Sequence, residues 1–155
     1  MTSTTPVIRS APRLLAASIA LVTVFGALLA DVVIPASADQ HLANDAWPPH
    51  AKFHDAQYIV MSILLGVLAL YLLRGDVTRS RLRTACALLA TPWLGLLGAF
   101  LFPGTAIQDP EFHNPAPLGL HPQALLAVVA LIVLAVATTL VAREDSPGCA
   151  GRRSG

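Results

Sequence analysis

Charged residues are scarce in this chain, and their scarcity excludes most classes of soluble protein. Only 12% of the 155 residues are Asp, Glu, Lys or Arg and 55% are hydrophobic, whereas soluble domains are about 25% charged. The formal net charge is +1, and no basic patch of the kind that binds nucleic acid is visible, so we expect no nucleic-acid partner. The composition instead predicts an integral membrane protein whose surroundings are the lipid bilayer.

The motifs of common soluble chemistries are also missing. The sequence has no phosphate-binding glycine loop, no GxSxG elbow, no CxxC pair and no HExxH motif. Its two cysteines are Cys86, in an apolar run, and Cys149, in a polar tail. We expect both to be free thiols. Whether the protein is an enzyme is left open by these absences.

Four long apolar runs are what the sequence has instead, at 14–34, 56–73, 84–102 and 124–142. At about 1.5 Å per residue, each run can cross a hydrocarbon core of about 30 Å as a helix. Helix is expected because lipid offers backbone groups no hydrogen-bond partner. With the second helix extended to 49–73, the sequence predicts an all-α fold, a four-helix transmembrane bundle.

The basic residues predict how this bundle is oriented. Nine of the ten precede the first run, fill the second connection or follow the fourth run, and Lys52 is the exception. By the positive-inside rule both termini are expected in the cytoplasm and the bundle in the plasma membrane. Residues 1–13 then form a cytoplasmic N-terminal segment, 14–142 the membrane domain, and 143–155 a disordered cytoplasmic tail.

The first apolar run permits a second interpretation, as a cleaved signal peptide. Arg9 and Arg13 precede it as a basic region would, and Ala36-Ser37-Ala38 resembles a signal-peptidase site. The run is longer than the roughly 7–15 residues usual in signal peptides, and Pro35 separates it from that site. We therefore expect a retained helix, with cleavage as the alternative.

Two outer loops, 35–55 and 103–123, carry all five histidines and eight of the twelve prolines. Loops this long and rich in proline are more often functional than mere connectors. An offset of 72 residues aligns Asp39-Gln40-His41 with Glu111-Phe112-His113. Such a duplication would bring the two loops face to face over the bundle.

The densest group of polar and aromatic side chains is the segment WPPHAKFHD, residues 47–55. Proline is tolerated in the first turn of a helix, so the second helix is expected to include this segment. His50 and His54 then lie one above the other, and Gln57 and Met61 continue the stripe into the membrane. A polar stripe at that depth normally faces the bundle interior.

The His-x-x-x-His spacing suits two imidazoles that bind one divalent metal ion such as zinc. Further ligands would come from the other outer loop, where Asp109 and Glu111 are also available. The candidate metal ligands are His50, His54, His113 and His121. No other cofactor is indicated.

The same histidines could instead transfer protons to a small lipophilic or lipid-like ligand, because imidazole titrates near neutral pH. Asp55 adjoins the pair, and Asp31, the sole acidic residue inside an apolar run, would face His54 if it turned inward. The candidate catalytic residues are His50, His54, Asp55 and Asp31. The candidate ligand contacts are Trp47, Gln57, Tyr58 and Met61.

A third interpretation gives these residues no chemistry. Aromatic side chains such as Trp47 and Tyr58 collect at the headgroup level simply as anchors. His41, His113 and His121 are loop residues beside prolines and small residues, and we interpret each as structural or incidental. The protein would then be a non-catalytic subunit whose outer loops dock a membrane protein partner or a second copy.

Two packing features are expected in the third helix. Gly95 and Ala99 form a small-xxx-small pair, which lets a neighbouring helix approach closely. Pro92 is expected to kink the helix, because proline lacks the backbone N–H and clashes with the preceding turn.

The WPPHAKFH segment, followed by Asp55-Ala56-Gln57, resembles the hallmark of a family of small four-helix membrane proteins of unknown function found in bacteria and fungi. The layout is more loosely similar to the sterol isomerase and sigma-2 receptor superfamily, whose members hold acidic and histidine side chains in a membrane cavity. That resemblance implies lipophilic ligands and points to Asp31, His54 and Asp55. Because no acidic residue lies deep in the later spans, it implies a ligand class and not an isomerase reaction.

Overall fold

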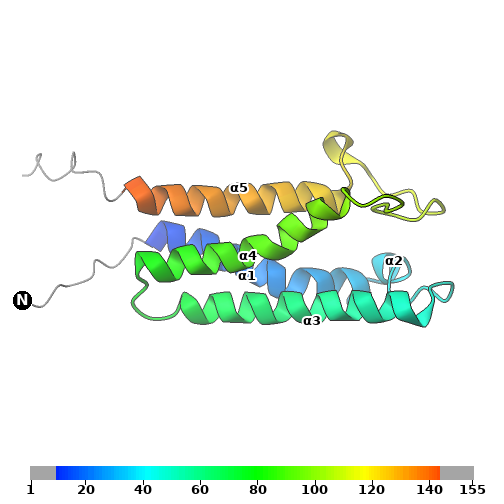
Figure 1. The fold of residues 1–155 in the computed structure, drawn as a ribbon, viewed down its shortest axis with the longest axis horizontal. Helices are drawn as coiled ribbons and strands as arrows, with labels where there is room; N and C mark the ends of the chain where they lie inside the picture. The colour runs from blue at the N-terminus through cyan, green and yellow to red at the C-terminus, as the bar shows by residue number, and fades with distance from the viewer. Residues whose placement is uncertain (1–9, 144–155) are drawn as a thin grey trace, which may run out of the picture.

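The structure, a computed structural model, describes residues 10–143 as a bundle of helices (Figure 1). The long helices are α1 (Ser10–Leu28), α3 (Pro49–Leu72), α4 (Arg79–Ala99) and α5 (Pro122–Arg143). The shorter segments are a π-helix (Leu29–Val33), α2 (Pro35–Ala38) and a 3-10 turn (Pro117–Gly119). Residues 10–143 contain no strand, so the all-α prediction is confirmed.

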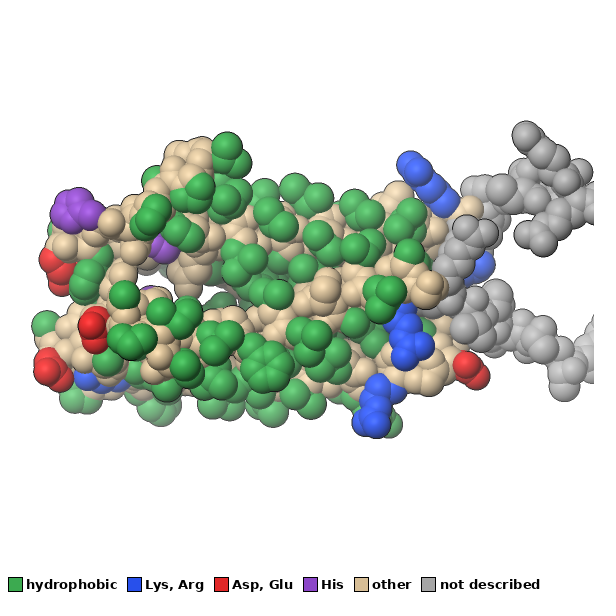
Figure 2. All heavy atoms as spheres, turned by 180° about the vertical axis from the view of Figure 1, so that it is seen from behind, with side chains coloured by type: hydrophobic (Ala, Val, Ile, Leu, Met, Phe, Trp, Pro, Cys, Tyr) green, Lys and Arg blue, Asp and Glu red, His purple; other side chains and the backbone are tan. Residues whose placement is uncertain are grey.

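Four helical segments are long and apolar enough to cross a membrane: Ser10–Val33, Pro49–Leu72, Arg79–Ala99 and Pro122–Arg143. Large hydrophobic side chains such as Leu64 point outward along the bundle, and they cover much of the surface in Figure 2. A surface this apolar suits lipid and not water. The chain is therefore a multi-pass membrane protein, as the composition predicts.

The start of α4 differs from the sequence prediction. The helix begins at Arg79 and not at Thr84 because the hydroxyl of Thr78 caps it, accepting a hydrogen bond from the backbone N–H of Arg81 at 3.3 Å. Apolar content could not reveal this basic first turn. α1 also begins earlier, at Ser10, and most of the predicted tail lies outside the described residues.

α1 packs against α3 and α5, and α4 packs against the same two helices. Small side chains dominate these contacts and let the helices approach closely. The residues with no exposed surface include Ala16, Ala20, Ala69, Leu82, Ala85, Leu89, Ala127, Ala130, Ala137 and Val141. Cys86 is buried among them as a free thiol, as expected, and Cys149 lies outside the described residues.

Two helices approach closely at Gly66 of α3, where the backbone meets α1. A Cβ at this position would lie 2.5 Å from Cγ2 of Val24 and 2.9 Å from the carbonyl oxygen of Ala20. The sequence placed close packing at Gly95 and Ala99 instead, and that prediction was wrong. A Cβ at Gly95 would meet no described atom within 4 Å, because small residues can border open space as well as a neighbouring backbone.

The described chain begins and ends at the same end of the bundle, where α3 also connects to α4 (Figure 1). There Arg13 donates a hydrogen bond to the carbonyl of Gly75 at 3.2 Å, and Arg81 donates to the carbonyls of Asp76 and Tyr71. Basic side chains gather at this end and histidines at the opposite one (Figure 2). We call these the basic end and the loop end.

Replacing Gly66 tests the contact between α1 and α3. We expect Gly66→Ala to lower the free energy of unfolding by about 1–3 kcal/mol, because the new methyl group overlaps α1. Gly95→Ala is the matched control. Its unfolding temperature should equal that of the parent or lie slightly above it, since alanine favours helix and the new methyl group has room. Thermal unfolding in detergent measures both, and equal unfolding temperatures for the two variants would contradict the contact.

Candidate functional site

Asp31 is a carboxylate buried at the loop end of the first span, where only 1% of its surface is exposed. α1 changes there from α-helical to π-helical over Leu29–Val33, and Asp31 is the central residue of that segment. The wide turn closes with a 2.8 Å hydrogen bond from the N–H of Ile34 to the carbonyl of Leu29. π-helical turns occur often at functional sites, and this one carries Asp31 inside the bundle.

The partner of Asp31 is His41, which returns over the helix end after the short helix α2. Nδ1 of His41 lies 3.4 Å from Oδ1 of Asp31 and 2.9 Å from the carbonyl oxygen of Ser37. A carbonyl can only accept, so Nδ1 carries the proton and Nε2 of a neutral His41 is an acceptor. The sequence suggested His54 as the partner of an inward Asp31, and the structure places His41 there instead. The expectation that His41 is structural or incidental is not tested by this contact.

Asp55, in the first turns of α3, belongs to the same cluster. It interacts electrostatically with Asp31 and His41, and Tyr58 interacts with both carboxylates. Both side-chain oxygens of Asp31 and Oδ2 of Asp55 are buried and accept no hydrogen bond from the described residues. Since unpaired buried oxygens are costly, such groups in a native structure usually mark a site with a role in binding or chemistry.

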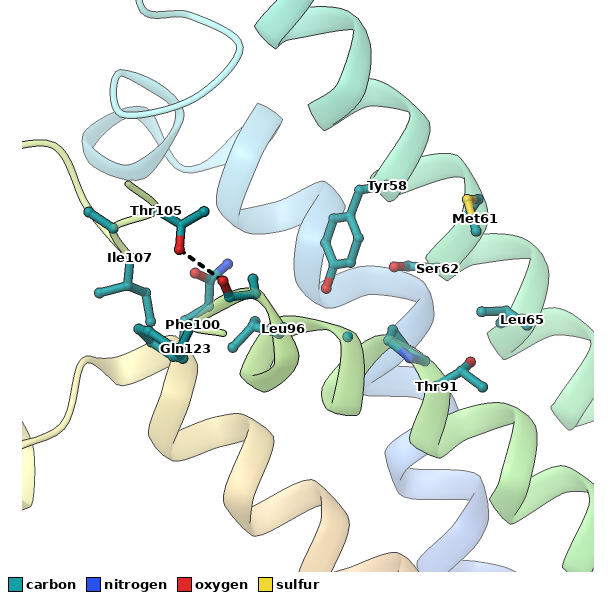
Figure 3. Close-up of a pocket in the computed structure, with 14 residues that line it drawn as sticks. Tyr58, Met61, Ser62, Leu65, Thr91, Leu96, Phe100, Thr105, Ile107 and Gln123 are labelled. Carbon is teal, nitrogen blue, oxygen red and sulfur yellow. Dashed lines mark hydrogen bonds between the residues drawn. The ribbon is translucent and has the colours of Figure 1, made fainter. Parts of the chain in front are cut away.

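A cavity of ≈ 480 Å³ lies beside this cluster, between α3 and α4 (Figure 3). Such a volume suits a small molecule. The hydroxyls of Tyr58 and Ser62 point into it from α3 (Figure 3). The remaining lining is mostly apolar and includes Leu65, Pro92, Gly95, Leu96, Ala99, Phe100 and Ile107. We call this space the span cavity.

Pro92 explains why the span cavity is open. It lines the cavity in the middle of α4, and the helix bends in the half that follows (Figure 1), as the sequence predicts. Proline removes the backbone hydrogen bond to the carbonyl of Leu88. That carbonyl instead accepts from the hydroxyl of Thr91 at 2.6 Å. The bend and the missing side chain of Gly95 together leave room beside α3.

A second cavity of ≈ 590 Å³ lies at the loop end, between α2 and the segment before α5, and we call it the loop cavity. The two outer loops meet across it. Trp47 Nε1 donates to Oδ2 of Asp109 at 3.1 Å, and the side-chain amides of Gln40 and Asn114 exchange hydrogen bonds of 2.7 and 3.2 Å. The surface is hollowed near this end in Figure 2.

His121 lines the loop cavity just before α5 and contacts Asn114. Burial and the nearby His41 lower the pKa of His121 below the ordinary imidazole value. The ring is therefore neutral near pH 7, where even an unperturbed imidazole is mostly deprotonated. No sequence signal distinguishes this histidine from the exposed His113 in the same loop.

The stripe of His50, His54 and Gln57 does not face the bundle interior as expected, since all three side chains are exposed. The buried face of α3 follows other residues, Ile59, Ser62, Gly66 and Ala69, and it is rotated away from the stripe because packing against α1 selects small side chains. Of the expected ligand contacts, Tyr58 and Met61 line the span cavity and Trp47 lines the loop cavity.

The four candidate metal ligands are not brought together. His50 and His54 adjoin, with their Nε2 atoms 3.1 Å apart, and Nδ1 of His54 lies 3.3 Å from Oε1 of Gln57. His113 is exposed and His121 belongs to the loop cavity. Across residues 10–143 no group of three or more His, Cys, Asp or Glu side chains could hold a metal ion. Metal binding by the His50 and His54 pair stays a prediction.

The fold and these cavities define a four-helix multi-pass membrane protein with polar side chains gathered at one end. The chain belongs to a family of unknown function, DUF6640, whose family model matches residues 16–153. The expected membership of a family of unknown function is thereby confirmed. Searches of curated proteins and of solved structures find no match.

A metal titration tests the exposed histidine pair. Two ligands on one tetrahedral zinc ion lie about 3.3 Å apart, close to the 3.1 Å between the Nε2 atoms of His50 and His54. We expect the purified protein to bind added zinc, and the His50→Ala, His54→Ala double variant to lose it in mass-spectrometric metal analysis. A His113→Ala, His121→Ala variant should keep its zinc. Zinc retained after loss of His50 and His54 would contradict the pair as ligands.

Proposed function

We propose that this protein binds a small lipophilic molecule in the span cavity, with the cluster of Asp31, His41 and Asp55 beside the polar end of that cavity. The observation that carries this proposal is the cavity of ≈ 480 Å³ at membrane depth, whose mostly apolar wall carries a few polar side chains, Tyr58 and Ser62 on α3 and Thr91, Thr105 and Gln123 opposite them. One of those residues, Tyr58, lies within electrostatic range of the buried Asp31 and the half-buried Asp55.

The polar groups are what would make such binding selective. A lipophilic molecule gains little by leaving lipid for an apolar cavity, because lipid tails are equally apolar. Hydrogen bonds at membrane depth therefore decide which molecule stays. Tyr58, Ser62 and Gln123 are placed to donate them, whereas the hydroxyls of Thr91 and Thr105 already donate to backbone carbonyls.

If the bound molecule is converted and not only held, the proposal places proton transfer at Asp31 and His41, with Asp55 as the neighbouring carboxylate. The carboxylate and imidazole lie 3.4 Å apart, and such a pair is a common acid and base couple. His50 and His54 suit this role less well, because both are exposed and line neither cavity.

We further propose that the basic end lies in the cytoplasm and that the bundle resides in the plasma membrane. The gathering of basic side chains at one end supports this orientation through the positive-inside rule (Figure 2). Both termini would then be cytoplasmic, and the loop cavity would open on the opposite side of the membrane. Lipophilic molecules could reach the span cavity from the bilayer itself.

A second candidate function is docking of a protein partner through the outer loops. Leu118 favours it, because this side chain is 88% exposed and its backbone has a φ of +56°. A non-glycine residue in that conformation is strained, and strain of this kind concentrates at binding surfaces and ligand contacts. Leu118 lines neither cavity, so docking and ligand binding can be separated by substitution.

Filling the span cavity tests the leading proposal. A Cβ at Gly95 or at Gly98 meets no described atom within 4 Å, yet only Gly95 lines the cavity. We expect Gly95→Leu to occupy the space and to reduce labelling by a photoreactive long-chain alcohol in lipid vesicles by about tenfold, which corresponds to about 1.4 kcal/mol. Gly98→Leu should label like the parent, and equal labelling of all three proteins would contradict the site.

A further inference from the structure

We infer that the loop cavity binds the polar end of the same ligand, and that this end is an uncharged group with an acceptor oxygen, a hydroxyl or a carbonyl. The ligand class is therefore an uncharged amphipathic lipid, whose apolar body lies in the span cavity. This inference rests on the proposed function and adds to it the chemistry that selects the ligand.

The two cavities adjoin. Ala106, Ile107 and Gln123 line both of them, so only this short stretch of loop and the first turn of α5 separate the two spaces. The span cavity is bordered by helices at membrane depth, whereas the loop cavity is bordered by the outer loops. A molecule that occupies both would have its apolar part in the bundle and its polar part between the loops.

The charges around the loop cavity argue against an ionic head. No lysine or arginine is among the residues that line it, and its one acidic lining residue, Asp109, already accepts from Trp47. Of its two histidines, His41 already lies against the carboxylate of Asp31 at 3.4 Å, and His121 is neutral near pH 7. A phosphate or carboxylate placed there would lose its hydration without gaining a counter-charge, which is costly. An uncharged oxygen has no such cost if a donor is available.

His121 supplies that donor. Its Nδ1 accepts a 3.3 Å hydrogen bond from the backbone N–H of Gln123, so the proton of the neutral ring is on Nε2. Nε2 faces Nδ2 of Asn114 at 3.1 Å, and both hydrogens of that amide are taken by Oε1 of Gln40 and Oε1 of Gln108, at 2.7 and 3.1 Å. Because an amide nitrogen cannot accept, the Nε2–H of His121 has no acceptor among the described residues.

The donor is held in a fixed place before any ligand arrives. Asn114 is bonded to Gln40 of the other outer loop in both directions, and Gln108 donates to the carbonyl of Phe112 at 3.1 Å. These bonds order both loops around His121 independently of a ligand. A preorganised donor loses little entropy on binding and discriminates well against a head that lacks an acceptor.

Four photoreactive probes with the same alkyl chain test this inference: an alcohol, a carboxylate, a trimethylammonium and a probe with no head. The full-length protein is labelled in phosphatidylcholine vesicles near neutral pH. We expect the alcohol to label the parent about fivefold more than any other probe, the effect of one neutral hydrogen bond. His121→Phe keeps a ring and removes the donor, so it should abolish this preference while labelling by the headless probe is unchanged.

His113→Phe is the matched control, because His113 lies in the same loop, is exposed and lines neither cavity; it should keep the preference for the alcohol. Equal labelling by all four probes that Gly95→Leu still blocks would overturn this inference and leave the proposed function standing. Stronger labelling by a charged probe, or a preference that survives in His121→Phe, would also overturn it. Labelling that Gly95→Leu does not reduce would overturn the proposed function itself.

Discussion

Lipid supplies no hydrogen bonds, and this constraint decides where the polar side chains of the bundle lie. Threonines within the spans satisfy it locally: Thr23 donates to the carbonyl of Ile19 at 2.8 Å, and Thr91 donates to that of Leu88. A carboxylate cannot bond to its own helix in this way, because it needs donors and the helix interior offers none. Asp31 is therefore turned inward by the π-helical segment, toward His41.

The spans were predictable from the sequence because the same constraint acts on every backbone group, so run length and apolar content determine them. The start of α4 was not predictable, since it is set by one local hydrogen bond to the hydroxyl of Thr78 in a basic segment. The rotation of α3 about its own axis was not predictable either. Any stripe of polar residues on one helix is compatible with several rotations, and the rotation observed depends on where Gly66 meets α1.

Some residues of the candidate site could likewise be predicted from the sequence, and others could not. Asp31 and Asp55 could be chosen from the sequence, because a carboxylate in or beside an apolar run is unusual on its own. His41, Asn114 and His121 could not, because their importance comes from contacts between loops far apart in the chain, as in the Gln40 to Asn114 pair. A histidine in a proline-rich loop has no periodicity that would reveal its partner.

The bundle uses small residues in two opposite ways around the span cavity. Gly66 lets α1 and α3 touch, on the buried face of α3 that also carries Ser62. Gly95 leaves its space open, and Pro92 bends α4 so that the space widens toward the loops. Tyr58 and Ser62, both on α3, line this space with their hydroxyls. The distance from those hydroxyls to His121 would then select the length of ligand that can use both ends.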